Sequence, residues 1–221
     1  DHRDLHSFPT RRSSDLISYM LKHIKKWTKP RRKRTPLAQF RAVSFTITEP
    51  YGTVLVMSPW NYPFLLSVDP LVEAIAAGNT VIIKTSEYSP YTNEIVKEII
   101  EDAFDPKYAT VILGGIIENQ TLIHAPVDYI FFTGSKKVGR IVYEAASKMG
   151  IPVTLELGGK SPCIVDRSAK IELTAKRIIF GKLLNVGQTC VAPDYILVKR
   201  EVHDKLIEAL KKEIIKQYGR S

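Results

Sequence analysis

The sequence predicts an α/β protein with a Rossmann-like, doubly wound parallel sheet, followed by an incomplete second α/β lobe. Between residues 49 and 157, short apolar runs rich in β-branched residues alternate with segments of helical length. This alternation favours buried parallel strands joined by crossover helices. The 221 residues are 44% hydrophobic, which is enough for a folded core and argues against intrinsic disorder of the whole chain.

The N-terminal segment differs from this pattern. Residues 1–16 are polar and have no hydrophobic period, which predicts a disordered leader. Their string resembles a translated sequencing adapter, so we expect the leader to be artefactual. A helix is predicted from Asp15, because Ser14 or Asp15 can cap it and apolar residues then recur at helical spacing. Pro30 should end this helix.

The next region, within residues 17–48, contains a basic run and a strand. The run KPRRKRT at 29–35 can bind nucleic acid or lipid, but it lacks interleaved aromatic residues and we interpret it as a solvated linker. The segment AVSFTIT at 42–48 predicts a strand whose edges remain open to pairing.

Residues 49–157 are predicted to form the doubly wound α/β domain. Its strands are expected at 53–57, 80–84, 109–113, 128–133 and 153–157, and its helices at 64–77, 90–104, 118–124 and 135–149. Ligands of doubly wound sheets collect at the carboxyl ends of the strands. The loops that follow the strands are therefore the first places to search for a site.

Residues 158–221 are expected to form the first part of a second lobe. Strands are predicted at 162–166 and 195–199, and helices at 171–185 and 202–218. Two strands give these helices little sheet to cover, which predicts that the lobe is truncated.

The charge of the chain is concentrated near its N-terminus. The formal net charge is +9, and residues 1–41 account for it with 12 Lys or Arg against 3 Asp or Glu. The remaining body is balanced, which argues against a nucleic-acid partner. Two cysteines cannot form a disulfide scaffold, and no apolar run approaches the roughly 18 residues of a membrane span. We therefore expect a cytoplasmic protein without a membrane span.

The loop after the first strand of the domain, SPWNYP at 58–63, is stiffened by two prolines. It leaves the Asn61 amide available as a donor to a carbonyl oxygen that becomes an oxyanion. An Asx turn before Pro63 is the alternative, and for this motif in isolation it is favoured.

The second strand is followed by Lys84 and, three residues later, Glu87. A cation that donates and a carboxylate that accepts suit the vicinal hydroxyls of a ribose. The alternative is that Ser86 and Glu87 only begin the next helix.

The fourth strand leads through TGSKKVG, at 133–139, directly into a helix. Gly134 and Gly139 leave space for a phosphate near the free N–H groups of the helix end. The middle glycine of the usual dinucleotide fingerprint is missing, so the motif is weak by itself. A tight turn with Gly134 at positive φ is an equal alternative.

Two further residues carry reactive groups. Glu156 ends an apolar strand before two glycines, which predicts partial desolvation, a raised pKa and a role as general base; a salt bridge to Lys160 is the alternative. Cys190 follows a helix in the polar loop NVGQTC, where a thiol needs local activation to be a nucleophile. Cys163 lies in a predicted strand and is interpreted as structural.

Taken together, these motifs resemble the aldehyde dehydrogenase family. The resemblance extends over residues 49–221, from EPYGTVLVMSPWNYPF through TLELGGKSPCIVD to NVGQTCVAPDYILV, and APDY resembles the class 3 branch. The segment at 27–48 resembles the oligomerisation arm of that family. Thr85 departs slightly from the family pattern, which usually has Pro there.

The resemblance implies that residues 49–157 form a dinucleotide-binding domain and residues 158–221 the first part of a catalytic domain. It also implies a role for each matching residue. Cys190 corresponds to the nucleophile, Glu156 to the base and Asn61 to the oxyanion-hole amide. The cofactor NAD, or NADP, would be bound by the remaining set of matching residues, which comprises Trp60, Lys84, Glu87, Gly134, Ser135, Val138 and Gly139. No metal is implied.

The implied function is NAD(P)-dependent oxidation of an aldehyde to a carboxylic acid through a cysteine thiohemiacetal and thioester, in a homodimer. A reductase that forms acyl-coenzyme A is one alternative, although LELGG with Glu156 favours hydrolysis. A non-catalytic incomplete copy is another. Family members continue well past the position of Ser221, so we expect the chain to be inactive by itself.

Overall fold

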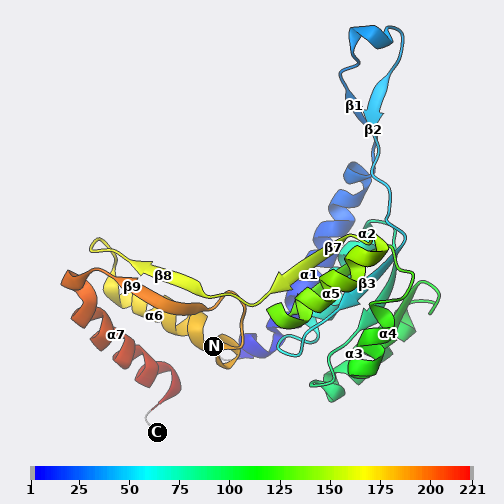
Figure 1. The fold of residues 1–221 in the computed structure, drawn as a ribbon. Helices are drawn as coiled ribbons and strands as arrows, with labels where there is room; N and C mark the ends of the chain where they lie inside the picture. The colour runs from blue at the N-terminus through cyan, green and yellow to red at the C-terminus, as the bar shows by residue number, and fades with distance from the viewer. Residues whose placement is uncertain (1–2, 220–221) are drawn as a thin grey trace. The chain divides into compact units, whose positions relative to one another are not determined.

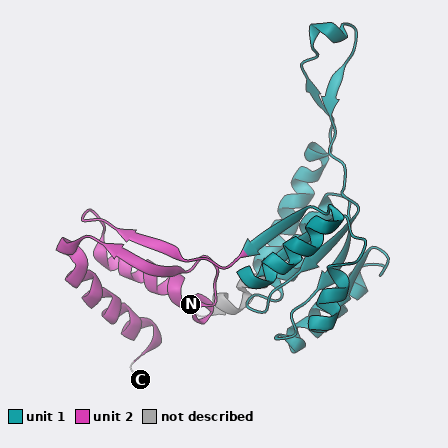
Figure 2. Ribbon diagram, viewed as in Figure 1, with its two compact units in different colours: residues 1–156 teal, residues 157–221 magenta. Residues whose placement is uncertain are grey.

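The computed structural model describes residues 3–219 and divides the chain into two compact units, residues 1–156 and 157–221 (Figure 2). The first unit contains a five-stranded sheet, and the second contains a two-stranded sheet with two helices (Figure 1). No helix in the described part of the chain is both long enough and apolar enough to cross a lipid bilayer.

The first helix, α1 (Arg3–Trp27), begins well before the predicted position at Asp15. Residues 3–16, which we expected to be disordered, are helical. That prediction relied on the missing hydrophobic period, but a polar contact anchors this part of the helix. Ser13 Oγ donates to Asp69 Oδ1 at 2.6 Å, and Asp69 lies in α2 (Leu65–Ala76).

A small hairpin follows α1. Strand β1 (Arg31–Lys33) pairs antiparallel with β2 (Ser44–Thr46), with Arg32 opposite Phe45, and the short helix η1 (Leu37–Gln39) lies between them. The basic run that we interpreted as a linker is therefore partly a strand. It pairs with the predicted strand at 42–48, whose backbone groups needed a partner.

The sheet of the first unit confirms the predicted fold class. Its strands are β3 (Thr53–Met57), β4 (Thr80–Lys84), β5 (Ala109–Ile112), β6 (Tyr129–Gly134) and β7 (Val153–Leu157). Their order is β5-β4-β3-β6-β7, with β3 parallel to both β4 and β6. The chain winds outward from β3 to β5 and then returns to the other side of β3. This reversal is the topological switch point at which doubly wound proteins bind ligands.

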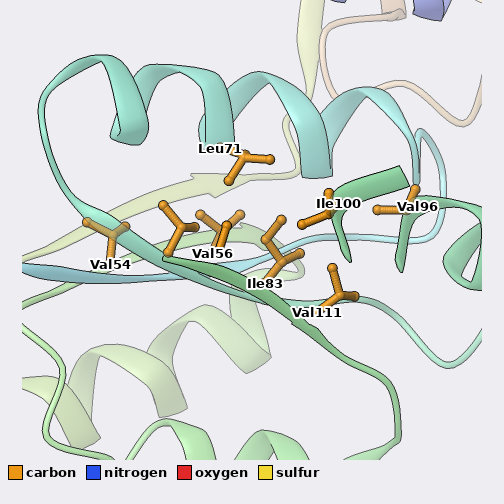
Figure 3. Close-up of a cluster of buried hydrophobic side chains, with 9 residues drawn as sticks. Val54, Val56, Leu71, Ile83, Val96, Ile100 and Val111 are labelled. Atoms are coloured by element: carbon orange, nitrogen blue, oxygen red, sulfur yellow. The ribbon is translucent and has the colours of Figure 1, made fainter. Parts of the chain in front are cut away.

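Helices cover the sheet and complete its core. They are α2, α3 (Pro90–Ala103), α4 (Ile116–Leu122) and α5 (Lys136–Met149). Figure 3 shows one face of the sheet, where Val56 and Ile83 pack with Leu71 of α2 and Ile100 of α3. Leu55 alternates with Val56 along β3 and is also fully buried, so both faces of this strand are covered.

The second unit contains β8 (Ser161–Val165), α6 (Ile171–Leu183), the short helix η2 (Leu184–Gly187), β9 (Pro193–Val198) and α7 (Arg200–Tyr218). Strands β8 and β9 are parallel, and Cys163 lies opposite Ile196. Their side chains on one face, including these two, pack on α6 and α7. The alternating positions point away, and Ile164 and Leu197 are 75% and 54% exposed. Within the described residues, this sheet therefore has one covered face.

Candidate active site

The sheet register brings three predicted loops to one edge of the first unit. Met57 lies beside Lys84 on one side and beside Phe132 on the other. The loops that begin after β3, β4 and β6 therefore start next to one another at the carboxyl ends of their strands. This arrangement gathers Trp60 and Asn61, Lys84 and Glu87, and residues 134–139 at the same edge.

The loop after β3 is tied to both neighbouring helices. Ser67 in α2 donates to Ser58 Oγ at 2.8 Å, and both hydroxyl groups are buried. Ser89, just before α3, donates from its Oγ to the carbonyl oxygen of Trp60 at 3.1 Å. The Trp60 side chain is 47% exposed, and Asn61 is half-buried next to it. The loop thus presents an aromatic ring and an amide from a fixed backbone.

Lys84 is the most deeply buried charged residue at this edge. Its side chain is 1% exposed, and Nζ donates to the carbonyl oxygens of Thr85 at 2.5 Å and Gly114 at 2.7 Å. Burial lowers the pKa of Lys84, while the nearby carboxylates of Glu87 and Glu118 oppose that change. An ammonium group has three N–H donors, and the bonds to described residues use two of them, which leaves one for a ligand. The exposed carboxylate of Glu87 is on the same loop.

Buried polar atoms next to this loop lack partners among the described residues. They are Thr85 Oγ1 and Asn93 Oδ1. Asn93 Nδ2 does bond, donating to the Ser86 carbonyl oxygen at 2.6 Å and so holding the loop on α3. Buried polar atoms normally have a hydrogen-bond partner. Their presence here fits a polar ligand or an ordered water at the edge that carries Lys84.

The turn after β6 is not the positive-φ glycine turn that was the alternative to a phosphate-binding turn. Gly134 is not among the described residues with positive φ. A Cβ atom at this position would lie 2.6 Å from Cζ of the Phe132 ring, and Phe132 is buried. Glycine is therefore required by the close approach of that ring rather than by a left-handed backbone.

Ser135 begins α5 as its N-cap. Its Oγ accepts a hydrogen bond from the Val138 N–H at 3.2 Å, and its carbonyl oxygen accepts from the Gly139 N–H at 2.8 Å. The N–H groups of Lys136 and Lys137 lie in the first turn, where a helix supplies no carbonyl partner. With the helix dipole and the exposed Lys136 and Lys137 side chains, this end of α5 is suited to an anion such as a phosphate.

Replacing Ser135 by Ala should destabilise the first unit by about 1 kcal/mol, because it removes the cap of α5. The measurement is the midpoint of urea unfolding with the slope unchanged. Ser135→Asn is the matched control, since Asn is also a strong cap, and it should restore most of the loss. Equal destabilisation by both substitutions would contradict the capping role.

Cys190 lies in the second unit on an exposed turn, closed by a hydrogen bond from the Ala192 N–H to the Thr189 carbonyl oxygen at 3.1 Å. The chain reaches this turn through Asn185 and Val186, with φ of 51° and 56°. Positive φ is a genuine outlier for a β-branched residue, and such strain concentrates at functional sites. Cys163, in contrast, is half-buried in β8, as predicted.

The glycine loop before β8 packs against the cysteine loop. A Cβ atom on Gly159 would lie 3.3 Å from the Cys190 carbonyl oxygen. Lys160 Nζ is 3.2 Å from Asp194 Oδ2, which ties the two loops together at the amino ends of β8 and β9. Asp194 is thus the partner that the structure gives Lys160, whereas the alternative prediction named Glu156.

Glu156 is exposed at the end of the first unit. The expected desolvation of its carboxylate is therefore not present. The prediction placed Glu156 at the end of an apolar strand, but that strand, β7, is the outermost one in the sheet order. Glu156 and Cys190 belong to different units, and each is positioned by its own loop. Among the side chains that the structure describes, those of residues 11–219, no group of three or more His, Cys, Asp or Glu suited to a metal occurs.

Glu118 lies close to Lys84 but was not among the predicted site residues. Its Oε2 accepts a hydrogen bond from the Gly115 N–H at 2.6 Å. Backbone hydrogen bonds from Glu118 and Gly115, and then the charge of Lys84, lower the pKa of this carboxyl group. The available signal was a carboxylate three residues after a glycine pair at the end of a strand.

Comparison with known proteins places these features in context. The sequence pattern of the aldehyde dehydrogenase family matches residues 5–218, a range that begins within the predicted leader. The 4,4'-diaponeurosporen-aldehyde dehydrogenase of Staphylococcus aureus is 56% identical over 93% of the chain and 45% of its own length. Aldehyde dehydrogenase family 3 member H1 of Arabidopsis thaliana is 46% identical over 93% of the chain and 43% of its own length.

A solved structure gives the same result. The aldehyde dehydrogenase of Mycobacterium tuberculosis, complexed with NAD+, superposes with a TM-score of 0.83 at 30% identity, covering 91% of this chain and 41% of that one. The chain spans about half the length of the curated relatives it matches.

Proposed function

The chain belongs to the aldehyde dehydrogenase family, and from this membership we propose that the complete protein oxidises an aldehyde to a carboxylic acid with NAD(P)+ as the hydride acceptor. The main support for the proposal is Cys190, whose thiol is exposed and free. Its loop is strained at Val186, and its backbone packs against Gly159. An exposed thiol on a fixed backbone is accessible to a carbonyl carbon.

The proposed chemistry begins at Cys190. Its thiolate attacks the aldehyde carbon, a C–S bond forms, and the carbonyl electron pair moves to oxygen. The Asn61 amide, from the loop fixed by Ser67 and Ser89, donates a hydrogen bond to that oxyanion in the closed complete protein. Loss of hydride from the same carbon leaves a thioester on Cys190.

Glu156 completes the proposed cycle. Its carboxylate removes a proton from a water molecule that attacks the thioester carbon. The C–S bond then breaks, the acid is released as carboxylate, and the Cys190 thiolate is regenerated. The exposed position of Glu156 leaves its carboxylate accessible to water. The proposed action of Glu156 on the Cys190 thioester refers to the complete protein.

The loops of the first unit fit the proposed cofactor. Bound NAD(P)+ would supply the hydride acceptor. Lys84 and Glu87 would bind the adenosine ribose through one remaining N–H donor and one carboxylate. The start of α5, with Ser135 and the N–H groups of its first turn, would bind a phosphate, next to Val138 and Gly139. Exposed Trp60 would contact the cofactor at the same edge.

We expect a preference for NAD over NADP in the complete protein. The Glu87 carboxylate can accept from a ribose 2'-hydroxyl but would repel a 2'-phosphate. The ratio of kcat/KM for the two cofactors measures this. Glu87→Gln keeps the shape of the side chain and should narrow the ratio, whereas an equal or higher kcat/KM with NADP in the wild type would contradict the assignment.

The proposal also includes a homodimer in the cytoplasm. The β1–β2 hairpin has strands of three residues each and exposes Phe45 and Ile47, which suits pairing with a second copy. The cytoplasmic location is proposed because two cysteines cannot form a disulfide scaffold.

The direct test is NADH formation by the complete protein with a panel of aliphatic and aromatic aldehydes. The proposal predicts aldehyde-dependent NADH and an equal amount of carboxylic acid. Aldehyde-dependent NADH that requires coenzyme A and yields an acyl-coenzyme A would instead favour the reductase alternative.

A further inference from the structure

The orientation of Lys84 depends on the loop that follows β5. Its Nζ bonds to the carbonyl oxygen of its neighbour Thr85, and its second acceptor is the Gly114 carbonyl oxygen, thirty residues away in the sequence. With two donors directed at these oxygens, the tetrahedral ammonium leaves its third donor in a defined direction. Any shift of the Gly114 carbonyl would therefore change where Lys84 points.

The Gly114–Gly115 segment is held in place by Glu118. The Glu118 carboxylate accepts from the Gly115 N–H at 2.6 Å, and this N–H belongs to the same peptide group as the Gly114 carbonyl. Gly114 has φ of +131°, and a Cβ atom there would lie 2.4 Å from Glu118 Cδ. The carboxylate thus packs directly on a backbone position that only glycine can occupy. The peptide plane is fixed from both sides, by Glu118 on its N–H and by Lys84 on its oxygen.

We propose that Glu118 is a positioning residue of the cofactor site, which acts through the Gly114–Gly115 peptide to orient Lys84 toward the ribose. The inference rests on the proposed cofactor role of Lys84. Glu118 contacts the peptide and not the cofactor. Its charge adds to that of Glu87 in favouring the ammonium form of a buried lysine.

The test measures the Kd for NAD+ by calorimetry on the complete protein, without aldehyde, so that binding is separated from turnover. Glu118→Ala removes the bond to Gly115 and should raise the Kd by about tenfold or more, as expected if the misoriented Lys84 ammonium loses its hydrogen bond to the ribose. Glu118→Gln keeps an acceptor oxygen and should restore binding to within about threefold of wild type. Glu98→Ala removes an exposed carboxylate from α3 and is the matched control for charge, with an unchanged Kd expected.

A double-mutant cycle with Lys84→Met tests whether Glu118 acts through Lys84. Met fills a similar volume without a charge, and the melting temperature checks that each variant folds. In the Lys84→Met background, Glu118→Ala should have no further effect on the Kd, because the residue that it orients is gone. The KM for aldehyde should not change in Glu118→Ala.

The outcomes separate the two proposals. If the wild type binds NAD+ but Glu118→Ala binds it equally well, or if the two substitutions have additive effects, the positioning role is wrong while the proposed function stands. If the wild-type complete protein does not bind NAD+, the proposed function fails and the inference fails with it.

Discussion

Replacing Cys190 by Ala in the complete protein is expected to remove NADH formation entirely, including the first turnover. Hydride can leave the substrate carbon only after the thiolate has added to it, because the free aldehyde has no oxyanion to drive the transfer. The measurement is rapid-mixing of enzyme, NAD+ and aldehyde, with NADH followed from the first milliseconds. Neither a burst nor a steady phase should be detected.

The second cysteine of the chain provides the control. Cys163 is half-buried in β8 and packs on the core of the second unit. Cys163→Ala should keep both the burst and the steady rate. If the burst survives in Cys190→Ala but disappears in Cys163→Ala, Cys163 is the nucleophile and the assignment of Cys190 is wrong.

Replacing Glu156 by Gln should separate the two halves of the reaction. If the carboxylate acts mainly on water, the first equivalent of NADH still forms rapidly and the enzyme then stalls as an acyl-enzyme. The steady rate should fall by about 10²–10⁴, the usual range for the loss of a general base. Gln nearly preserves the shape of Glu, and an unchanged melting temperature excludes gross destabilisation.

Two other results for Glu156→Gln would change the assignment. Loss of the burst as well as the steady rate would mean that the carboxylate also deprotonates Cys190, which moves its role to the first step. Unchanged burst and steady rate would mean that Glu156 is structural. Lys160→Ala, which breaks only the ion pair with Asp194, checks whether the glycine loop itself matters for the steady rate.

The sheet of the first unit was predictable because its strands can be recognised from the local hydrophobic pattern of the sequence. Strands β3, β4 and β7 have the predicted bounds, since each is a short apolar run between polar turns. The start of α1 was not predictable in this way. Its anchor is the Ser13–Asp69 contact, which joins residues distant in the sequence and leaves no hydrophobic period. Strand β1 was missed for a related reason, because its residues are basic and only the pairing with β2 makes them a strand.

The position of Lys84 and Ser135 at one edge of the sheet was predictable, because each lies at the carboxyl end of a strand and the ends of parallel strands meet there. The partners of such residues were not predictable where they come from another loop. Two such partners come from the loop that follows β5. Lys84 bonds to Gly114 and Glu118 bonds to Gly115, and both bonds depend on the path of this loop next to the end of β4. The exposure of Glu156 likewise depends on the position of β7 in the sheet order, which the periodicity of one strand does not specify.

The central claim is that Cys190 carries the acyl group during turnover, and mass spectrometry of the Glu156→Gln variant of the complete protein tests it most directly. After mixing with aldehyde and NAD+ and rapid quenching in acid, the peptide that contains Cys190 should gain the mass of one acyl group. The gain should be absent without NAD+, because a thiohemiacetal reverts on quenching and a thioester does not. An acyl group on the Cys163 peptide, or NADH formation with no acylated cysteine at any quench time, would contradict the account.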